Sequence, residues 1–185
     1  IEEDALQTDW ALWAVTDLKT VLVSNLPFQI SSSLVIDRSL DENGISIMVL
    51  MFQKEVAQRI RARASTSDYG LLSVVAQNFW TVETVCDASP RDFFPAPKIA
   101  SRVLSFQRKQ SEIKNRRLFL NFVKAAFAQR RKQLKSNLNS GSQWAGKDPG
   151  GLASWLEKNG KELTARAEEL SPQEIKDLYF HLGLE

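Results

Sequence analysis

Apolar and mixed stretches alternate along the first half of the chain. Four apolar stretches have the length and composition of strands, over residues 21–25, 45–52, 72–85 and 103–106. The first two are continuously apolar, which is typical of strands covered on both faces of a sheet. A turn-rich segment separates the last two, which favours their antiparallel pairing.

A helix is predicted between the second and third of these strands, over residues 54–63. Val56 and Ile60 lie four positions apart and share one helical face. Glu55 and Arg59 share another face, where they can form an ion pair. Strands and helix together predict an α/β domain with an antiparallel edge.

The pattern becomes purely helical from about residue 112. An apolar stripe at helical spacing begins at Leu118 and continues to Leu138, which predicts one helix over that stretch. A second helix is expected over residues 152–160, ending at Gly160. A third helix should begin after Ser171, which can cap it, with a glutamate three positions on. We therefore expect two domains, residues 1–110 and a small all-α domain over residues 111–185.

Composition narrows the class of protein. A chain of 185 residues with 43% hydrophobic residues can bury an ordinary globular core. The single cysteine excludes an internal disulfide and suits a reducing compartment. The longest apolar run is too short to cross a bilayer, and the first residues are acidic where a signal peptide is basic. These features predict a cytoplasmic protein, and the single histidine gives no reason to expect a metal.

Positive charge is concentrated in the middle of the chain. Residues 98–135 hold 12 Lys and Arg against 1 acidic residue, although the net charge of the whole chain is only +2. Such a local excess attracts phosphates and gains from counterion release, so it suits a polyanion such as RNA. A solvated basic helix has the same composition, and charge alone does not separate the two interpretations.

The tetrapeptide Asn25-Leu26-Pro27-Phe28 directly follows the first predicted strand. Ligands of open α/β sheets bind beyond the carboxyl ends of strands, so the position suits a site. An amide oxygen and a backbone carbonyl can accept both hydrogens of an exocyclic amine, and an aromatic ring can stack on the attached base. Holding the amine in this way would orient its nitrogen for attack on an electrophilic methyl group. The tetrapeptide also fits an ordinary turn at a strand end.

Five ordered motifs extend this hypothesis over nearly the whole chain: NLPFQIS, FQKEVAQRI, DYGLLSVVAQ, FFPAPKIAS and AFAQRRKQLKSNL. In this order they resemble the ribosomal RNA adenine dimethyltransferases, and most closely the small-subunit branch. The resemblance implies a Rossmann-like methyltransferase followed by a helical domain. It also implies S-adenosylmethionine as cofactor, two adjacent adenines of small-subunit rRNA as substrate, and a role in ribosome biogenesis.

The resemblance assigns roles to individual residues. Asn25 corresponds to the residue that contacts cofactor and target, Leu26 and Pro27 to the backbone that accepts from the amine, and Phe28 to the stacking position. Phe93 corresponds to a second aromatic near the base, with Phe94 expected in the core. The cofactor adenine would be bound by Asp4, and rRNA would be contacted by Lys98 and by a basic helix carrying Arg130, Arg131 and Lys132.

One part of the family pattern has no counterpart in this sequence. The family begins with a glycine-rich loop after its first strand, whereas this chain has no glycine before Gly44. We therefore expect a fragment that lacks about the first third of a dimethyltransferase and that is inactive alone. Residues 21–25 would then form an open strand edge through which the chain self-associates, or which pairs with another segment. The alternative is a non-catalytic RNA-binding or ribosome-assembly factor, or a transcription-factor relative, of the same fold.

Overall fold

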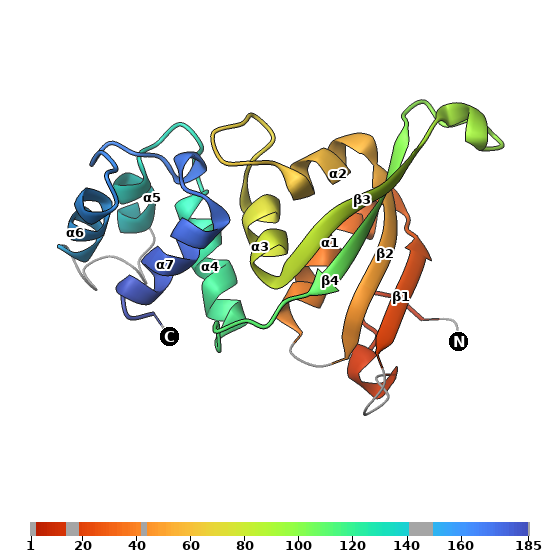
Figure 1. Cartoon of the computed structure of the whole chain (residues 1–185), viewed down its shortest axis with the longest axis horizontal. Coiled ribbons are helices and arrows are strands. Elements are labelled where there is room, and N and C mark those ends of the chain that lie inside the picture. Colours follow the sequence, from red (N-terminus) through yellow and green to blue (C-terminus); the bar gives the residue numbers. More distant parts are fainter. Residues whose placement is uncertain (1–2, 14–18, 42–43, 141–149, 185) are drawn as a thin grey trace. The chain divides into compact units, whose positions relative to one another are not determined.

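The computed structural model describes residues 3–13, 19–41, 44–140 and 150–184 (Figure 1). The chain divides into two compact units. The first unit comprises residues 1–61 and 79–110, and the second comprises residues 62–78 and 111–185. One boundary between the units lies between residues 110 and 111, and residues 62–78 group with the residues that follow it.

A four-stranded mixed sheet forms the centre of the first unit. Its strands are β1 (Thr20–Asn25), β2 (Ile45–Gln53), β3 (Trp80–Ala88) and β4 (Ser101–Arg108), in the order β1-β2-β4-β3. β1 and β2 are parallel, and β4 is antiparallel to both β2 and β3. The predicted antiparallel pairing of the last two strands is therefore confirmed.

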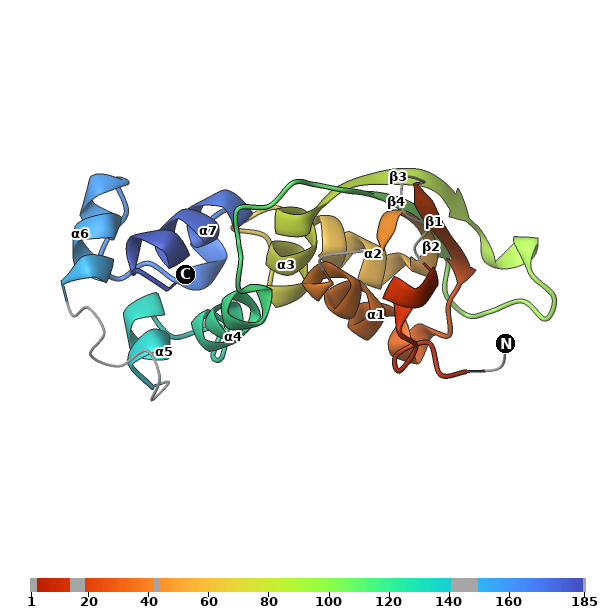
Figure 2. The ribbon, with the colours of Figure 1, turned by 90° about the horizontal axis from the view of Figure 1, so that it is seen from below.

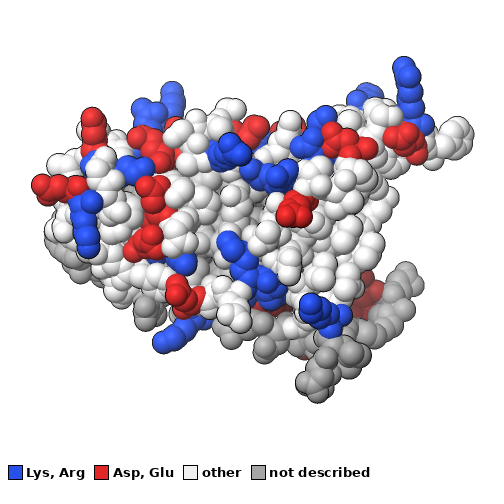
Figure 3. All heavy atoms as spheres, in the orientation of Figure 1, with Lys and Arg blue, Asp and Glu red and all other residues white. Residues whose placement is uncertain are grey.

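Helices α1 (Phe28–Leu40) and α2 (Lys54–Arg61) lie on one face of this sheet (Figures 1 and 2). Met48, Leu50 and Phe52 of β2 point to that face and are fully buried. The opposite face is more open, since Val21 and Val23 of β1 are 50% and 72% exposed. Figure 3 shows a broad uncharged area over β1, β2 and β4 on this side. The prediction that the first strand is covered on both faces is therefore wrong for the described residues.

The end of α1 is attached to the sheet by Arg108 of β4. Its guanidinium donates hydrogen bonds to the carbonyls of Arg38 (3.0 Å), Asp41 (2.8 Å) and Ile45 (2.7 Å). The same guanidinium lies 4.2 Å from the centre of the Trp80 ring. One half-buried cation thus provides hydrogen bonds to two carbonyls at the end of α1 and to the carbonyl of the first residue of β2.

The predicted strand over residues 72–85 is wrong in its first half. Residues Leu71–Phe79 form helix α3, and only from Trp80 does the chain enter β3. The amide of Gly70 donates to Ser73 Oγ (3.2 Å), which ties down the start of the helix. A continuous apolar run fits a buried helix as well as a buried strand, and here packing overrides the preference of valine for strands.

The second unit is helical and contains α4 (Arg116–Ala126), α5 (Leu134–Ser140), α6 (Gly151–Lys158) and α7 (Pro172–His181). The predicted capping box at α7 is confirmed, because Ser171 Oγ accepts from the amide of Glu174 and the glutamate accepts from Ser171. Gly160 follows α6 with a φ of 65°, as expected for a residue that ends a helix. None of the described helices has the length and hydropathy to cross a membrane.

Residues 62–78 belong to this unit through buried hydrogen bonds. The hydroxyl of Tyr69 donates to the Leu170 carbonyl (2.8 Å), and its ring lies edge-on to Phe127. The amide nitrogen of Asn78 donates to the Pro172 carbonyl (3.0 Å). Burial raises the pKa of Tyr69, which keeps the hydroxyl protonated as a donor. These contacts explain why α3 groups with residues far along the chain.

Candidate active site

The segment Asn25 to Phe28 links the end of β1 to the start of α1. Asn25 is the last residue of β1, and Leu26 is buried with 6% of its surface exposed. Pro27 has a φ of −55° and precedes the first residue of the helix, where a missing N–H costs nothing. Its carbonyl already accepts from the amide of Ile30 (3.1 Å), which leaves one lone pair for a ligand. Phe28 opens the helix and is 40% exposed.

A second wall comes from the loop between β3 and β4. The short 3-10 helix η2 (Pro90–Asp92) begins it, and the Asp92 carboxylate accepts from the Ser89 amide (2.7 Å). Phe93 is half-buried, whereas Phe94 is 102% exposed. The prediction that Phe94 belongs to the core is therefore wrong: its side chain projects from the loop to solvent.

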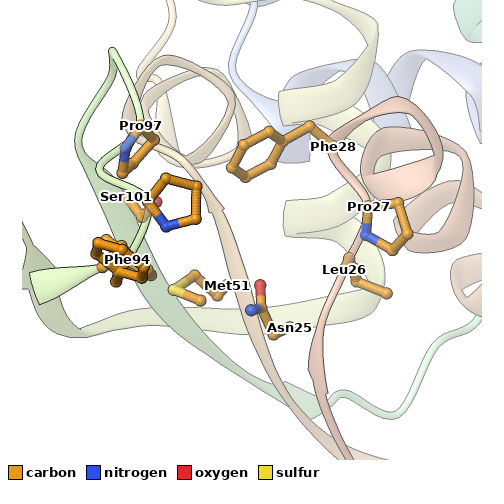
Figure 4. A pocket seen from close by; sticks show the side chains of 10 residues that line it. Asn25, Leu26, Pro27, Phe28, Met51, Phe94, Pro97 and Ser101 are labelled. Carbon is orange, nitrogen blue, oxygen red and sulfur yellow. The ribbon is translucent and has the colours of Figure 1, made fainter. Parts of the chain in front are cut away.

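The two walls enclose a pocket of about 400 Å³, a size that suits a small ligand. Figure 4 shows the side chains of residues 25–28 on one side and those of Phe94, Pro97 and Ser101 on the other, with Met51 between them. The pocket is lined by Asn25, Leu26, Pro27, Phe28, Met51, Phe93, Phe94, Pro95, Pro97 and Ser101. Most of this lining is apolar or aromatic, with a side-chain amide and a hydroxyl as its polar groups. Such a lining suits a flat ring that carries a few hydrogen-bonding groups.

Ion pairs fix the strand ends behind the second wall. Asp87 of β3 accepts two hydrogen bonds from the guanidinium of its cross-strand partner Arg102 and lies 3.2 Å from Lys54 Nζ. The hydrogen bonds from these cations lower the pKa of Asp87. The start of α2 is also held, because the Lys54 amide donates to the carbonyl of Ala100 (2.9 Å). The segment from Ala100 to Arg102 is therefore anchored on two sides.

Two of the residues predicted to bind cofactor or RNA lie apart from the lining. The carboxylate of Asp4 accepts from the Leu6 amide (2.9 Å) and from Gln7 Nε2 (3.1 Å), so it caps a local turn. Asp4 is exposed and retains lone pairs for a further donor. Lys98 is also exposed, in the loop that carries Phe93.

The basic cluster Arg130, Arg131 and Lys132 does not lie on a helix. The predicted continuous helix is wrong, because α4 ends at Ala126 and α5 begins at Leu134. The break is stabilised by Asn137, whose amide nitrogen donates to the carbonyls of Ala126 (2.8 Å) and Gln129 (3.0 Å). A buried amide thus replaces the helical hydrogen bonds that the break removes.

Arg130 also differs from its neighbours in the use of its side chain. Its guanidinium donates to the Glu168 carboxylate (3.2 Å) and to the carbonyl of Ser67 (2.7 Å). Arg131 and Lys132 are exposed, and the described residues provide no ion-pair partner for either. The three cations therefore divide into one that links segments of the helical unit and two that face solvent.

Five residues of the pocket were not predicted as part of it: Met51, Phe94, Pro95, Pro97 and Ser101. Met51 and Ser101 lie in strands, and only the pairing of β1, β2 and β4 brings them beside Asn25. Phe94 lies beside the predicted site residue Phe93, but no pattern in the sequence predicts that its side chain is exposed. Strand register, which a single sequence specifies weakly, was the missing information.

The family model for ribosomal RNA adenine dimethylases matches residues 1–171. The chain belongs to the ribosomal RNA adenine dimethylase family. The chain is 57% identical to the ribosomal RNA small subunit methyltransferase A of Bdellovibrio bacteriovorus over 185 residues, covering 100% of this chain and 67% of the relative. It is 38% identical to the protein of the same name from Syntrophotalea carbinolica, with 95% and 66% covered.

Solved structures agree on the fold of this dimethylase family member. A dimethyladenosine transferase from Plasmodium falciparum superposes with a TM-score of 0.75 at 23% identity, covering 99% of this chain and 72% of the other. The 23S rRNA methyltransferase ErmE gives a TM-score of 0.67 at 20% identity, with 99% and 71% covered. The predicted Rossmann-like α/β class is thereby confirmed. The chain spans about two thirds of the length of the curated relatives it matches.

Proposed function

We propose that this chain forms the target-base half of an S-adenosylmethionine-dependent enzyme that dimethylates N6 of two adjacent adenines in small-subunit rRNA. The observation that carries the proposal is the pocket between residues 25–28 and the loop of Phe93. It combines an amide, a nearby backbone carbonyl and two aromatic rings, the groups needed to hold an amine-bearing base. Family membership supports the same substrate class.

In this proposal the base lies between the two walls of the pocket. Phe28 stacks on its ring, a contact worth about 1–3 kcal/mol per base. The side-chain oxygen of Asn25 and the Leu26 carbonyl accept the two hydrogens of N6. These contacts turn the amine so that its lone pair points to one side of the ring plane, and orientation rather than a strong base carries the reaction.

The residues present fit part of the proposed cofactor. Asn25 lines the pocket, and the Asp4 carboxylate is exposed and able to accept from an adenine amine. When bound, S-adenosylmethionine supplies the electrophilic methyl group. No glycine precedes Gly44 in this chain to cradle the rest of the cofactor, so our experiment uses base binding as its readout.

The basic loop of residues 130–132 and Lys98 are proposed to contact RNA phosphates, and the site of action is proposed to be the cytoplasm during ribosome biogenesis. Support comes from the exposure of Lys98, Arg131 and Lys132 and from the names of the relatives. Phosphate contacts position an RNA without reading its sequence, so the pocket would select the base.

The experiment measures binding of the chain to a short RNA loop with two adjacent adenosines, and to the same RNA with purine riboside, which lacks the N6 amine. We expect the amine to contribute about ten- to thirtyfold in affinity, because it donates two hydrogen bonds worth about 1 kcal/mol each. Asn25→Ala should remove about half of this free-energy difference, whereas Phe28→Ala should weaken binding of both RNAs by the same factor. Equal affinity of the wild-type chain for both RNAs would contradict the proposal and favour RNA binding through the basic loop alone.

A further inference from the structure

Ser101 carries the hydroxyl group of the pocket lining. It is the first residue of β4 and is only 1% exposed, yet it lines the pocket. Figure 4 shows it on the wall opposite Asn25, beside Pro97. This buried polar side chain reaches a pocket and is well placed to meet a ligand, because none of the hydrogen bonds among the described residues involves its hydroxyl.

The strand register sets the separation of Ser101 from Asn25. Asn25 pairs with Met51 of β2, and Met51 pairs with Val103 of β4. Ser101 lies two residues from Val103, so its side chain is on the same face of the sheet as that of Asn25. Strands about 4.8 Å apart that rise about 3.4 Å per residue place the two Cα atoms about 12 Å apart. A flat ring held by a hydrogen bond at each side fits between two such residues.

We propose that the Ser101 hydroxyl donates a hydrogen bond to a ring nitrogen of the target adenine, either N1 or N7. This inference rests on the proposed function. The amine of adenine is a donor and needs acceptors, which Asn25 and a backbone carbonyl supply. The ring nitrogens on either side of the amine are acceptors and need a donor, which a serine hydroxyl supplies.

The hydrogen bond from Ser101 would stop the base from rotating within its own plane, which the other contacts allow. Stacking on Phe28 fixes the plane of the base but allows it to rotate within that plane. A grip on the amine gives one pivot, and a second hydrogen bond at another atom of the ring stops the rotation. Ser101 therefore acts as a positioning residue for N6. Its short side chain lies on an anchored strand, so the hydroxyl has little freedom to move.

The sheet offers a matched control in Ser105. It lies four residues further along β4, on the same face, opposite Val49 and Glu83, and outside the pocket. We expect Ser101→Ala to weaken binding of the adenosine RNA about three- to tenfold, the range for one lost hydrogen bond. Ser105→Ala should leave affinity unchanged.

RNAs with 1-deazaadenosine or 7-deazaadenosine in place of both target adenosines provide the decisive readout. The analogue that lacks the partner nitrogen should weaken wild-type binding by the same factor, and Ser101→Ala should cause no further loss with it. If Ser101→Ala weakens binding of both analogue RNAs by the same factor as it weakens binding of the adenosine RNA, the role of Ser101 is purely structural. Wild-type affinity that is the same for adenosine and for both analogues would overturn the inference without any variant. If the wild-type chain still binds the adenosine RNA more tightly than the purine riboside RNA, the proposed function stands even though this inference fails.

Discussion

Arg130 and Arg131 are neighbours with different surroundings. Substitution by alanine is therefore expected to affect stability at one position and RNA binding at the other. The Arg130 side chain is 49% exposed and pairs with Glu168 and with the Ser67 carbonyl. Arg131 faces solvent in the same loop. We expect Arg130→Ala mainly to destabilise the helical unit and Arg131→Ala mainly to weaken RNA binding.

The magnitudes follow from these contacts. An exposed ion pair contributes about 0–1 kcal/mol and a hydrogen bond about 1 kcal/mol, so Arg130→Ala should cost about 1–2 kcal/mol. That loss corresponds to about 3–6 °C in Tm for a chain of this size. Arg131→Ala should leave Tm unchanged. If Arg131 contacts one phosphate, its loss should reduce the slope of log Kd against log salt concentration by about 0.7–0.9.

Thermal unfolding followed by circular dichroism gives the stabilities, and fluorescence anisotropy of a labelled rRNA hairpin at four or more salt concentrations gives the slopes. Lys132→Ala serves as a second solvent-facing control and should behave like Arg131→Ala. Our assignment fails if Arg130→Ala leaves Tm unchanged while reducing the slope as much as Arg131→Ala does. If the slope of log Kd against log salt concentration is unchanged in all three variants, the basic loop does not contact RNA phosphates and is a solvated surface.

Three further predictions concern the first unit. Arg108→Lys replaces three hydrogen bonds with at most one and should lower the free energy of unfolding, measured by urea titration, by about 2 kcal/mol or more. Arg102 lies on the same strand and pairs with Asp87 at the surface, so Arg102→Lys is the control and should cost under about 1 kcal/mol. Val23→Lys places a charge on the exposed edge strand and should reduce self-association in sedimentation velocity, and a wild-type chain that stays monomeric at all concentrations would refute the edge proposal. The lowered pKa of Asp87 means that its stabilising contribution is present above about pH 4, the unfolded value, and is lost as pH falls; Asp87→Asn should therefore flatten the acid side of the stability profile, measured as Tm against pH.

Much of the fold followed from local patterns in the sequence. β1, β2, α2 and the capped start of α7 were all predicted, because each depends on side chains within a few residues of one another. The segment Leu71–Phe79 was assigned to a strand, because its apolar run does not distinguish a buried helix from a strand. The break before Leu134 was missed, because it depends on a hydrogen bond from Asn137 that spans eleven residues.

The candidate site divides in the same way. Asn25 to Phe28 could be proposed from the sequence because they follow a recognisable strand, and position after a strand suffices to suggest a site. Phe93 entered through resemblance to a family. Met51 and Ser101 reach the pocket through strand pairing alone, and the exposure of Phe94 depends on the course of an irregular loop. Residues of these kinds require a three-dimensional structure.

The two walls of the pocket also bear on how the protein reaches its native state. They are far apart in the sequence and become neighbours only after β2 has paired with both β1 and β4. Contacts between distant segments form slowly, since the intervening chain must be ordered first. The pocket should therefore be among the last features to appear during refolding. Recovery of base binding would then lag behind recovery of helical signal.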